Sequence, residues 1–277
     1  MLDFSDGTTV QAATALGVFD RIVCGVDESP EALEAARQAE RLRSPDGLLR
    51  VAAVTDVDTA VHAGFAMSHV LTQLDESAHA ALHRAIATVR PGSSHILAGS
   101  PARCLLDAVE RYDATLVAAG PHGHSRALGA LLGGVSATLL HEAPCSVLLA
   151  RRPRFGRFPS SILVGVDGSE HSLAAAAVGM ELAERFGSEL CLVAATGGKA
   201  VDLAPVRELT PFFVQDPGRP VEALTELSRE ADLLVVGSRG LHGLTSLGSV
   251  SERVAHKALC SVLVVRPTTE STSGGSS

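Results

Sequence analysis

The chain has 277 residues, which is enough for one large domain or two ordinary ones. It carries 23 Lys and Arg against 31 Asp and Glu, a formal net charge of −8, so a nucleic-acid surface built from clustered basic residues is not expected. No apolar run reaches the roughly 18 residues of a membrane span, and residues 1–10 lack a secretory pattern. We therefore expect a cytoplasmic protein with no membrane partner.

Residues 1–18 are predicted to be disordered, and after them short apolar runs alternate with longer amphipathic ones. Strands are predicted near 21–27, 48–54, 94–98, 115–119 and 146–150, and helices near 30–43, 68–90, 101–112 and 134–142. The strands show little polar alternation, as expected when helices cover both faces of a sheet. This order of elements predicts a doubly wound parallel sheet with right-handed crossovers.

The second half of the sequence repeats this pattern of elements. "RIVCGVDESPEALEAA" from residue 21 matches "SILVGVDGSEHSLAAA" from residue 161, and three later blocks match in the same order. We therefore predict two tandem α/β domains, at 19–152 and 160–267. Residues 153–159, which overlap the Pro- and Gly-containing "RRPRFGRF" of residues 151–158, are predicted as a linker, and 268–277 as a disordered tail.

The two copies differ in length. Gly99 lies 72 positions after Asp27, whereas the matching Gly218 lies only 51 positions after Asp167. The missing length coincides with the second helix of the first copy, and the second copy offers only a short piece around 198–208. We expect this helix to be truncated or lost, which would leave one sheet face thinly covered.

The five cysteines are widely spaced and form no C-x-x-C pair. Most lie inside apolar runs, which favours small buried core residues in a reducing compartment over disulfides or a zinc site. They are Cys24, Cys104, Cys145, Cys191 and Cys260.

Each copy has a glycine-rich loop after its fourth predicted strand, and a second pair of small residues that begins the next helix. The residues are Gly120, Gly123, Gly133 and Gly134 in the first copy and Gly237, Gly240, Gly248 and Ser249 in the second. Ligands of open parallel sheets lie at the carboxyl ends of the strands, where glycines allow backbone amides to approach phosphate oxygens. A helix start at the same place favours an anion.

Two alternatives stay open for these residues. The glycines can serve only as turns and a helix cap, with Ser249 as the N-cap. Asp27 and Asp167 each end the first strand of their copy beside the same crevice, where a carboxylate could meet a ribose or a base. Each could instead cap the helix that follows.

Over residues 20–267 the chain resembles a tandem universal stress protein. The family's signature is G-x2-G-x9-G followed by Ser or Thr, and its ATP-binding members hold the phosphates there. In the first copy nine residues separate Gly123 from Gly133, and Gly134 stands at the hydroxyl position. In the second copy Ser249 supplies the hydroxyl, but only seven residues separate the second glycine from the Gly-Ser pair.

The resemblance implies ATP as the ligand, with or without Mg²⁺, with Asp27 and Asp167 on the adenosine side. It also implies five-stranded sheets of order 3-2-1-4-5 whose fifth strands pair across a dimer. Here those strands begin at residues 146 and 261 of one chain, so the protein is expected to be a monomer with an internal pseudo-dimer or a homodimer. Pairing inside the chain would cover edges that otherwise stay exposed.

No P-loop, G-x-S-x-G elbow or evident general base is present, so we expect slow ATP hydrolysis or none. The first hypothesis is a stress-response sensor or adaptor that binds ATP in one or both copies and acts on an unidentified protein partner. The alternative is an interaction module whose nucleotide sites are degraded. If only one copy binds ATP, the retained Ser249 favours the second copy. The first copy retains the full loop and the second helix, so the sequence does not settle the choice.

Overall fold

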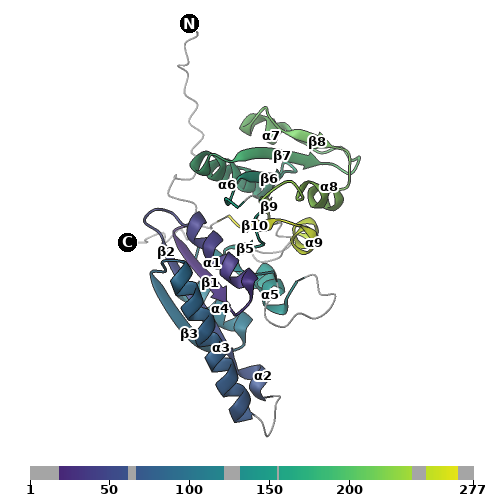
Figure 1. Ribbon diagram of the computed structural model, residues 1–277. Coiled ribbons are helices and arrows are strands. Elements are labelled where there is room, and N and C mark those ends of the chain that lie inside the picture. Colours follow the sequence, from purple (N-terminus) through teal and green to yellow (C-terminus); the bar gives the residue numbers. More distant parts are fainter. Residues whose placement is uncertain (1–18, 62–66, 122–131, 155, 239–247, 268–277) are drawn as a thin grey trace, which may run out of the picture.

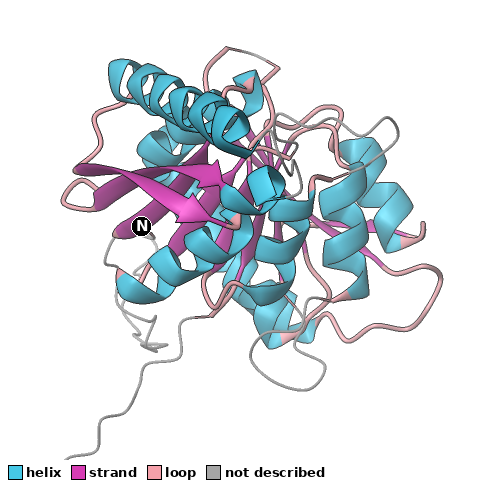
Figure 2. Ribbon diagram, turned by 90° about the horizontal axis from the view of Figure 1, so that it is seen from below, coloured by secondary structure: helices cyan, strands magenta, loops and turns pink. Residues whose placement is uncertain are grey.

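The computed structural model of the protein describes residues 19–61, 67–121, 132–154, 156–238 and 248–267. These residues build one ten-stranded sheet with helices on both faces (Figures 1 and 2). The strand order is β3-β2-β1-β4-β5-β10-β9-β6-β7-β8. The two ends predicted to be disordered lie outside the described residues.

In the first half, all five predicted strands and all four predicted helices form. The elements are β1 (Arg21–Val26), α1 (Pro30–Leu42), β2 (Leu48–Asp56), α2 (Val57–Val61), α3 (Met67–Thr88), β3 (Ser93–Gly99), α4 (Pro101–Arg111), β4 (Leu116–Ala119), α5 (Gly134–Glu142) and β5 (Ser146–Leu149). The short α2 was not predicted.

The second half repeats this order with a shorter second helix. Its elements are β6 (Ser161–Gly165), α6 (Glu170–Phe186), β7 (Glu189–Ala195), α7 (Ala204–Leu209), β8 (Val214–Asp216), α8 (Pro220–Leu227), β9 (Leu233–Gly237), α9 (Ser249–Lys257) and β10 (Ser261–Val265). Within the described residues, no helix combines the length and apolarity needed to span a membrane.

Local signals fix where the helices begin and end. Ser29 caps α1 by accepting a hydrogen bond from the amide of Ala32, and Pro30 occupies the first helical position, where its missing N–H costs nothing. Ser169 caps α6 in the same way. The same helix ends at Gly187, which adopts a left-handed conformation with φ 62°.

Each half has the strand order 3-2-1-4-5, and the pairs within a half are parallel. The halves meet where β5 and β10 pair in antiparallel fashion, with Val147 opposite Val264 and Leu149 opposite Val262. These strands are buried throughout. The expectation that the fifth strands pair inside one chain is therefore confirmed.

The apolar core forms two layers, one on each face of the sheet. One layer contains residues of α1, α3, α6 and α7, and the other contains residues of α4, α5, α8 and α9. Each layer continues from the first half into the second. The predicted domain and linker limits therefore stay predictions, because the core is not divided at the junction.

Two arginines that follow the paired strands bind the opposite half. Arg151 donates hydrogen bonds to the carbonyls of Ala255 (2.7 Å) and of the residue before β10 (3.1 Å). Arg266 donates to the carbonyls of Leu140 (2.5 Å) and of the residue before β5 (3.1 Å). Each guanidinium thus binds one carbonyl near the C-terminal end of the last helix in the other half and one in the turn that follows this helix.

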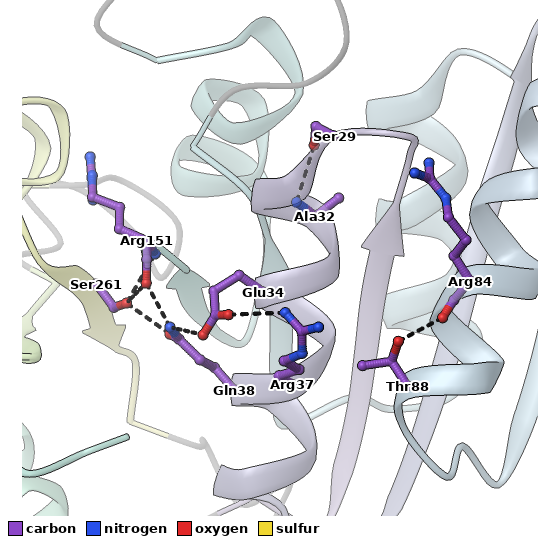
Figure 3. Close-up of polar contacts among 9 residues, drawn as sticks. All are labelled: Ser29, Ala32, Glu34, Arg37, Gln38, Arg84, Thr88, Arg151 and Ser261. Atoms are coloured by element: carbon purple, nitrogen blue, oxygen red, sulfur yellow. Dashed lines mark hydrogen bonds and ion pairs between the residues drawn. The ribbon is translucent and has the colours of Figure 1, made fainter. Parts of the chain in front are cut away.

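A smaller polar cluster completes the junction (Figure 3). Gln38 of α1 donates to the carbonyl of Arg151 (2.7 Å) and accepts from the hydroxyl of Ser261 (2.8 Å). Gln38 and Ser261 are both almost fully buried. The side chains of Gln38 and Ser261 thus both have hydrogen-bond partners, so their burial is not costly. Their bonds also fix the position of α1 relative to β10 of the other half.

The second half has one thinly covered face, as expected from its missing length. There α7 has 6 residues, against 22 in α3. On that face Leu190 of β7 is 37% exposed, whereas Leu49, at the matching position of β2, is 1% exposed. The expected truncation of the second helix is therefore confirmed.

The cysteine prediction is confirmed in part. Cys24, Cys145 and Cys260 are buried, and burial raises the pKa of each thiol to about 12. Cys191 is exposed and Cys104 is partly exposed, so for these two the prediction of a buried core residue is wrong. The physical reason for Cys191 is that α8, on its side of the sheet, has 8 residues where α4 has 11.

Candidate functional site

A cavity of about 420 Å³ lies at the carboxyl ends of β1, β2 and β4 in the first half. The strand order reverses between β1 and β4, so the cavity occupies the position where open parallel sheets bind ligands. Its size falls within the range of small-molecule sites, about 300–1,000 Å³. Four of the predicted site residues line it: Asp27, Gly120, Gly133 and Gly134.

The N-terminus of α5 faces this cavity without a side-chain cap. The N-cap residue is Gly133, which has no side chain to accept from the first amides of the helix. A Cβ added to Gly134 would meet nothing within 4 Å, so the approach to those amides is open. Unpaired N–H groups together with the helix dipole make this a favourable place for an anion.

Asp27 both lines the cavity and supports the cap of α1. Its Oδ1 accepts from the amide (2.8 Å) and the hydroxyl (2.5 Å) of Ser29. The hydroxyl of Ser29 in turn accepts from the amide of Ala32 and so caps α1, as Figure 3 shows. The two roles considered for this carboxylate are therefore compatible. Asp56, at the end of β2, lines the same cavity and was not predicted.

The long helix α3 forms one wall of the cavity through Leu74, Ser77 and Ala78. It is attached to the loop after β1, because Ser77 donates a hydrogen bond to Glu28 (2.6 Å) and Arg84 lies 3.7 Å from the same carboxylate. Sequence reasoning missed these residues. The only signal for them was that the first copy has a full-length second helix and the second copy does not.

The first glycine of each loop allows a close approach to the first helix of its half. A Cβ on Gly120 would lie 3.0 Å from Glu31, and a Cβ on Gly237 would overlap the carbonyl of His171. Gly237 therefore requires glycine for packing whether or not a ligand binds, whereas at Gly120 a side chain fits only if its neighbours move by a few tenths of an ångström. Gly123 and Gly240 lie outside the described residues.

A serine at the start of the last helix ties each loop to that helix. Ser136 donates a hydrogen bond to the carbonyl of Gly120, and Ser251 donates to that of Gly237, both at 2.6 Å. Sequence reasoning missed this pair, although the two serines occupy matching positions in "GGVS" and "GSVS".

The corresponding cavity of the second half has a volume of about 110 Å³. Asp167, Gly237, Gly248 and Ser249 line it, and Asp167 accepts from Ser169 as Asp27 does from Ser29. The chain before α7 lies directly against the loop after β6. At Gly168, with φ +79°, a Cβ would overlap the carbonyl of Asp202.

Comparison with known proteins agrees with this architecture. The model of the universal stress protein family matches residues 19–151 and 199–266. A universal stress protein of Mycolicibacterium smegmatis is 31% identical, over 93% of this chain and 99% of that protein. One from Mycobacterium tuberculosis is 30% identical, over 88% of this chain and 96% of that protein.

The fold is also that of a solved structure. The crystal structure of a universal stress protein from Archaeoglobus fulgidus matches with a TM-score of 0.67 and 21% identity, over 89% of this chain and 98% of that one. With two family segments and relatives aligned over nearly their whole length, the chain belongs to the universal stress protein family, in its tandem form.

Proposed function

We propose that the protein is a stress-response sensor or adaptor that binds one adenine nucleotide, ATP, in the cavity of the first half. The observation that carries the proposal is the uncapped N-terminus of α5 beside an open cavity of about 420 Å³. Membership of the family supports ATP as the ligand. The second cavity, at about 110 Å³, is far below the size of such sites, so we assign binding to the first half alone.

The lining of the first cavity fits the separate parts of a nucleotide. Open backbone amides at Gly134 and the residues after it suit the phosphates. Apolar side chains such as Val54 and Leu105 suit a base. The carboxylates of Asp27 and Asp56 can accept hydrogen bonds from ribose hydroxyls or a base amine.

Mg²⁺, if it accompanies ATP, would be held mainly by the phosphates. The described residues contain no cluster of three or more His, Cys, Asp or Glu side chains that could hold a metal ion. Mg²⁺ commonly uses one or two carboxylates together with substrate phosphates and water. Asp27 and Asp56, which both line the cavity, could supply such carboxylates.

A matched pair of substitutions tests the assignment. Asp27→Ala and Asp167→Ala remove carboxylates that make the same hydrogen bonds to a serine amide and hydroxyl, so their structural costs should be similar. By calorimetric titration with Mg-ATP, we expect Asp27→Ala to weaken binding about tenfold or more and Asp167→Ala to leave it unchanged.

Thermal unfolding of both variants provides the control for stability. Equal losses of ATP affinity in two folded variants would contradict binding in the first half. Wild-type protein that gives no heat of binding with millimolar Mg-ATP would favour the alternative function, an interaction module without a nucleotide.

A further inference from the structure

A second cavity of the first half lies on the sheet face covered by α4, and the proposed function does not use it. Its volume is about 140 Å³. Side chains of β2, β3 and α4 line it, and they include two arginines, a histidine and the C-cap residue of α4. The polar lining residues are Arg50, His95, Cys104, Asp107, Arg111 and Tyr112.

Arg50 is held in a defined position by aromatic stacking. Its guanidinium lies over the ring of Tyr112, 4.4 Å from the centroid. Tyr112 in turn stacks on His95, with ring centroids 6.0 Å apart. Stacking uses the face of a guanidinium and leaves its N–H groups free in the plane, where they suit the two oxygens of an acid group.

One donor of this cluster has no partner within the described part of the chain. Nη1 of Arg50 is buried and has no hydrogen-bond partner among the described residues. Within that same part of the chain, no ion pair joins Arg50 or Arg111 to a carboxylate. A buried cationic N–H without an acceptor is costly, and an acid oxygen entering the cavity would supply one.

The fold does not require this arrangement. Val23 of β1 pairs with Arg50, and the matching Leu163 of β6 pairs with Cys191. The second half thus has a small apolar side chain where the first has an arginine. In a chain of net charge −8, two unpaired arginines beside one cavity are a local exception.

From this geometry we propose that the cavity binds the acid group of a small molecule, a carboxylate or a phosphate, through Arg50 and Arg111. A charge-assisted, bidentate contact with Arg50 would hold the acid, and Arg111 at the rim would add a second positive charge. Asp107, also exposed at the rim, would disfavour ligands that extend a second anionic group toward it.

The chain contains its own reporter for this site. Tyr112 is the only tyrosine and there is no tryptophan, so the tyrosine fluorescence of the full chain comes from this cavity alone. Inorganic phosphate and succinate, titrated separately at constant ionic strength, serve as probes for the two kinds of acid. We expect a saturable change with at least one probe, and the stronger one identifies the acid.

Substitutions separate binding from general charge effects. Arg50→Met and Arg111→Met should each raise the apparent Kd of the probe about tenfold. Arg90→Met, at an exposed arginine outside the cavity lining, should leave this Kd unchanged. Because Arg111 is exposed, we expect Arg111→Met to fold. It therefore tests probe binding even if Arg50→Met fails to fold. Asp27→Ala, in the proposed ATP cavity, should give the same fluorescence titration curve as the wild type. This result would show that the probe binds independently of the ATP site.

The proposal is overturned if neither probe gives saturation up to about 20 mM. It is equally overturned if the two cavity variants respond as the wild type does, or if Arg90→Met weakens the response as much as they do.

Discussion

Gly134 is the residue at which the first site departs most clearly from the family's pattern. It begins α5 and lines the open cavity, at the place where the second half has Ser249. A Cβ added there would meet nothing within 4 Å among the described residues, so a small side chain can begin at this position without displacing them. The site therefore binds phosphate, in our account, through backbone amides alone.

Gly134→Ser should strengthen ATP binding. The new hydroxyl can donate to a phosphate oxygen, and a hydrogen bond to a charged group is worth about 1.5 kcal/mol, which is roughly tenfold in affinity. Calorimetric titration measures the change, with Ser249→Gly as the matched control that should leave ATP affinity unaltered. Unchanged or weaker binding by a Gly134→Ser variant of wild-type stability would contradict the account.

Gly237→Ala should destabilise the fold rather than act on ligand binding. Its Cβ would overlap the carbonyl of His171, whereas a Cβ on Gly120 would still lie 3.0 Å from Glu31. We expect losses near about 3 kcal/mol for Gly237→Ala and about 1 kcal/mol for Gly120→Ala, because overpacking costs of this order are typical. The midpoint of urea unfolding measures both.

Gly134→Ala is the control for this series. It adds the same methyl group in open space at the start of a helix, where alanine is the better helix former, so stability should be unchanged or slightly higher. A loss of stability as large as that of Gly237→Ala would show that close packing is not what selects glycine at position 237.

At the scale of elements, the last helix of each half is held at both ends. The N-terminal residues of α5 line the first cavity, where Ser136 donates a hydrogen bond to the carbonyl of Gly120. Near its C-terminus the carbonyl of Leu140 accepts a hydrogen bond from Arg266, which follows β10 of the other half. In the second half, α9 is held in the same way, by the bond from Ser251 to the carbonyl of Gly237 and by the bond from Arg151 to the carbonyl of Ala255. The second half thus positions the helix on which the proposed site depends.

Arg266→Met should therefore lower the free energy of unfolding by about 2–4 kcal/mol. The arginine is 6% exposed, and its loss leaves two buried carbonyls without a donor. Denaturant unfolding followed by circular dichroism measures the effect, and Arg90→Met, at an exposed position, is the control. If the two variants were equally stable, these hydrogen bonds would not hold the halves together.

Sequence reasoning predicted the elements well where the apolar pattern is strong. In the first half every predicted strand and helix lies within about three residues of its observed limits, because buried strands and amphipathic helices differ sharply in period. The five-residue α2, with the sequence VDTAV, is too short to show a period and was missed.

The site was predicted less completely, for a physical reason. A glycine that allows close helix packing, such as Gly120, looks the same in the sequence as a glycine that admits a phosphate. In the second half the chain near Asp202 packs against Gly168, a contact between segments with no shared motif. Such tertiary contacts leave no periodic signal.

At the scale of the whole molecule, the two halves share a fold but differ in the space they leave for a ligand. The cavities measure about 420 and 110 Å³, and α3 lines only the larger one. The two core layers and the β5–β10 pair make the second half a built-in partner of the first. The free edges of the combined sheet are β3 and β8.

The number of ATP molecules bound per chain tests this account most directly. Equilibrium dialysis of the wild-type protein against labelled Mg-ATP should give one bound nucleotide per 28.6 kDa chain, since both last helices begin without a side-chain cap but only the first cavity has the volume for a nucleotide. Two bound nucleotides would show that the second cavity opens to accept ATP. No binding at millimolar ATP would contradict the proposed function itself.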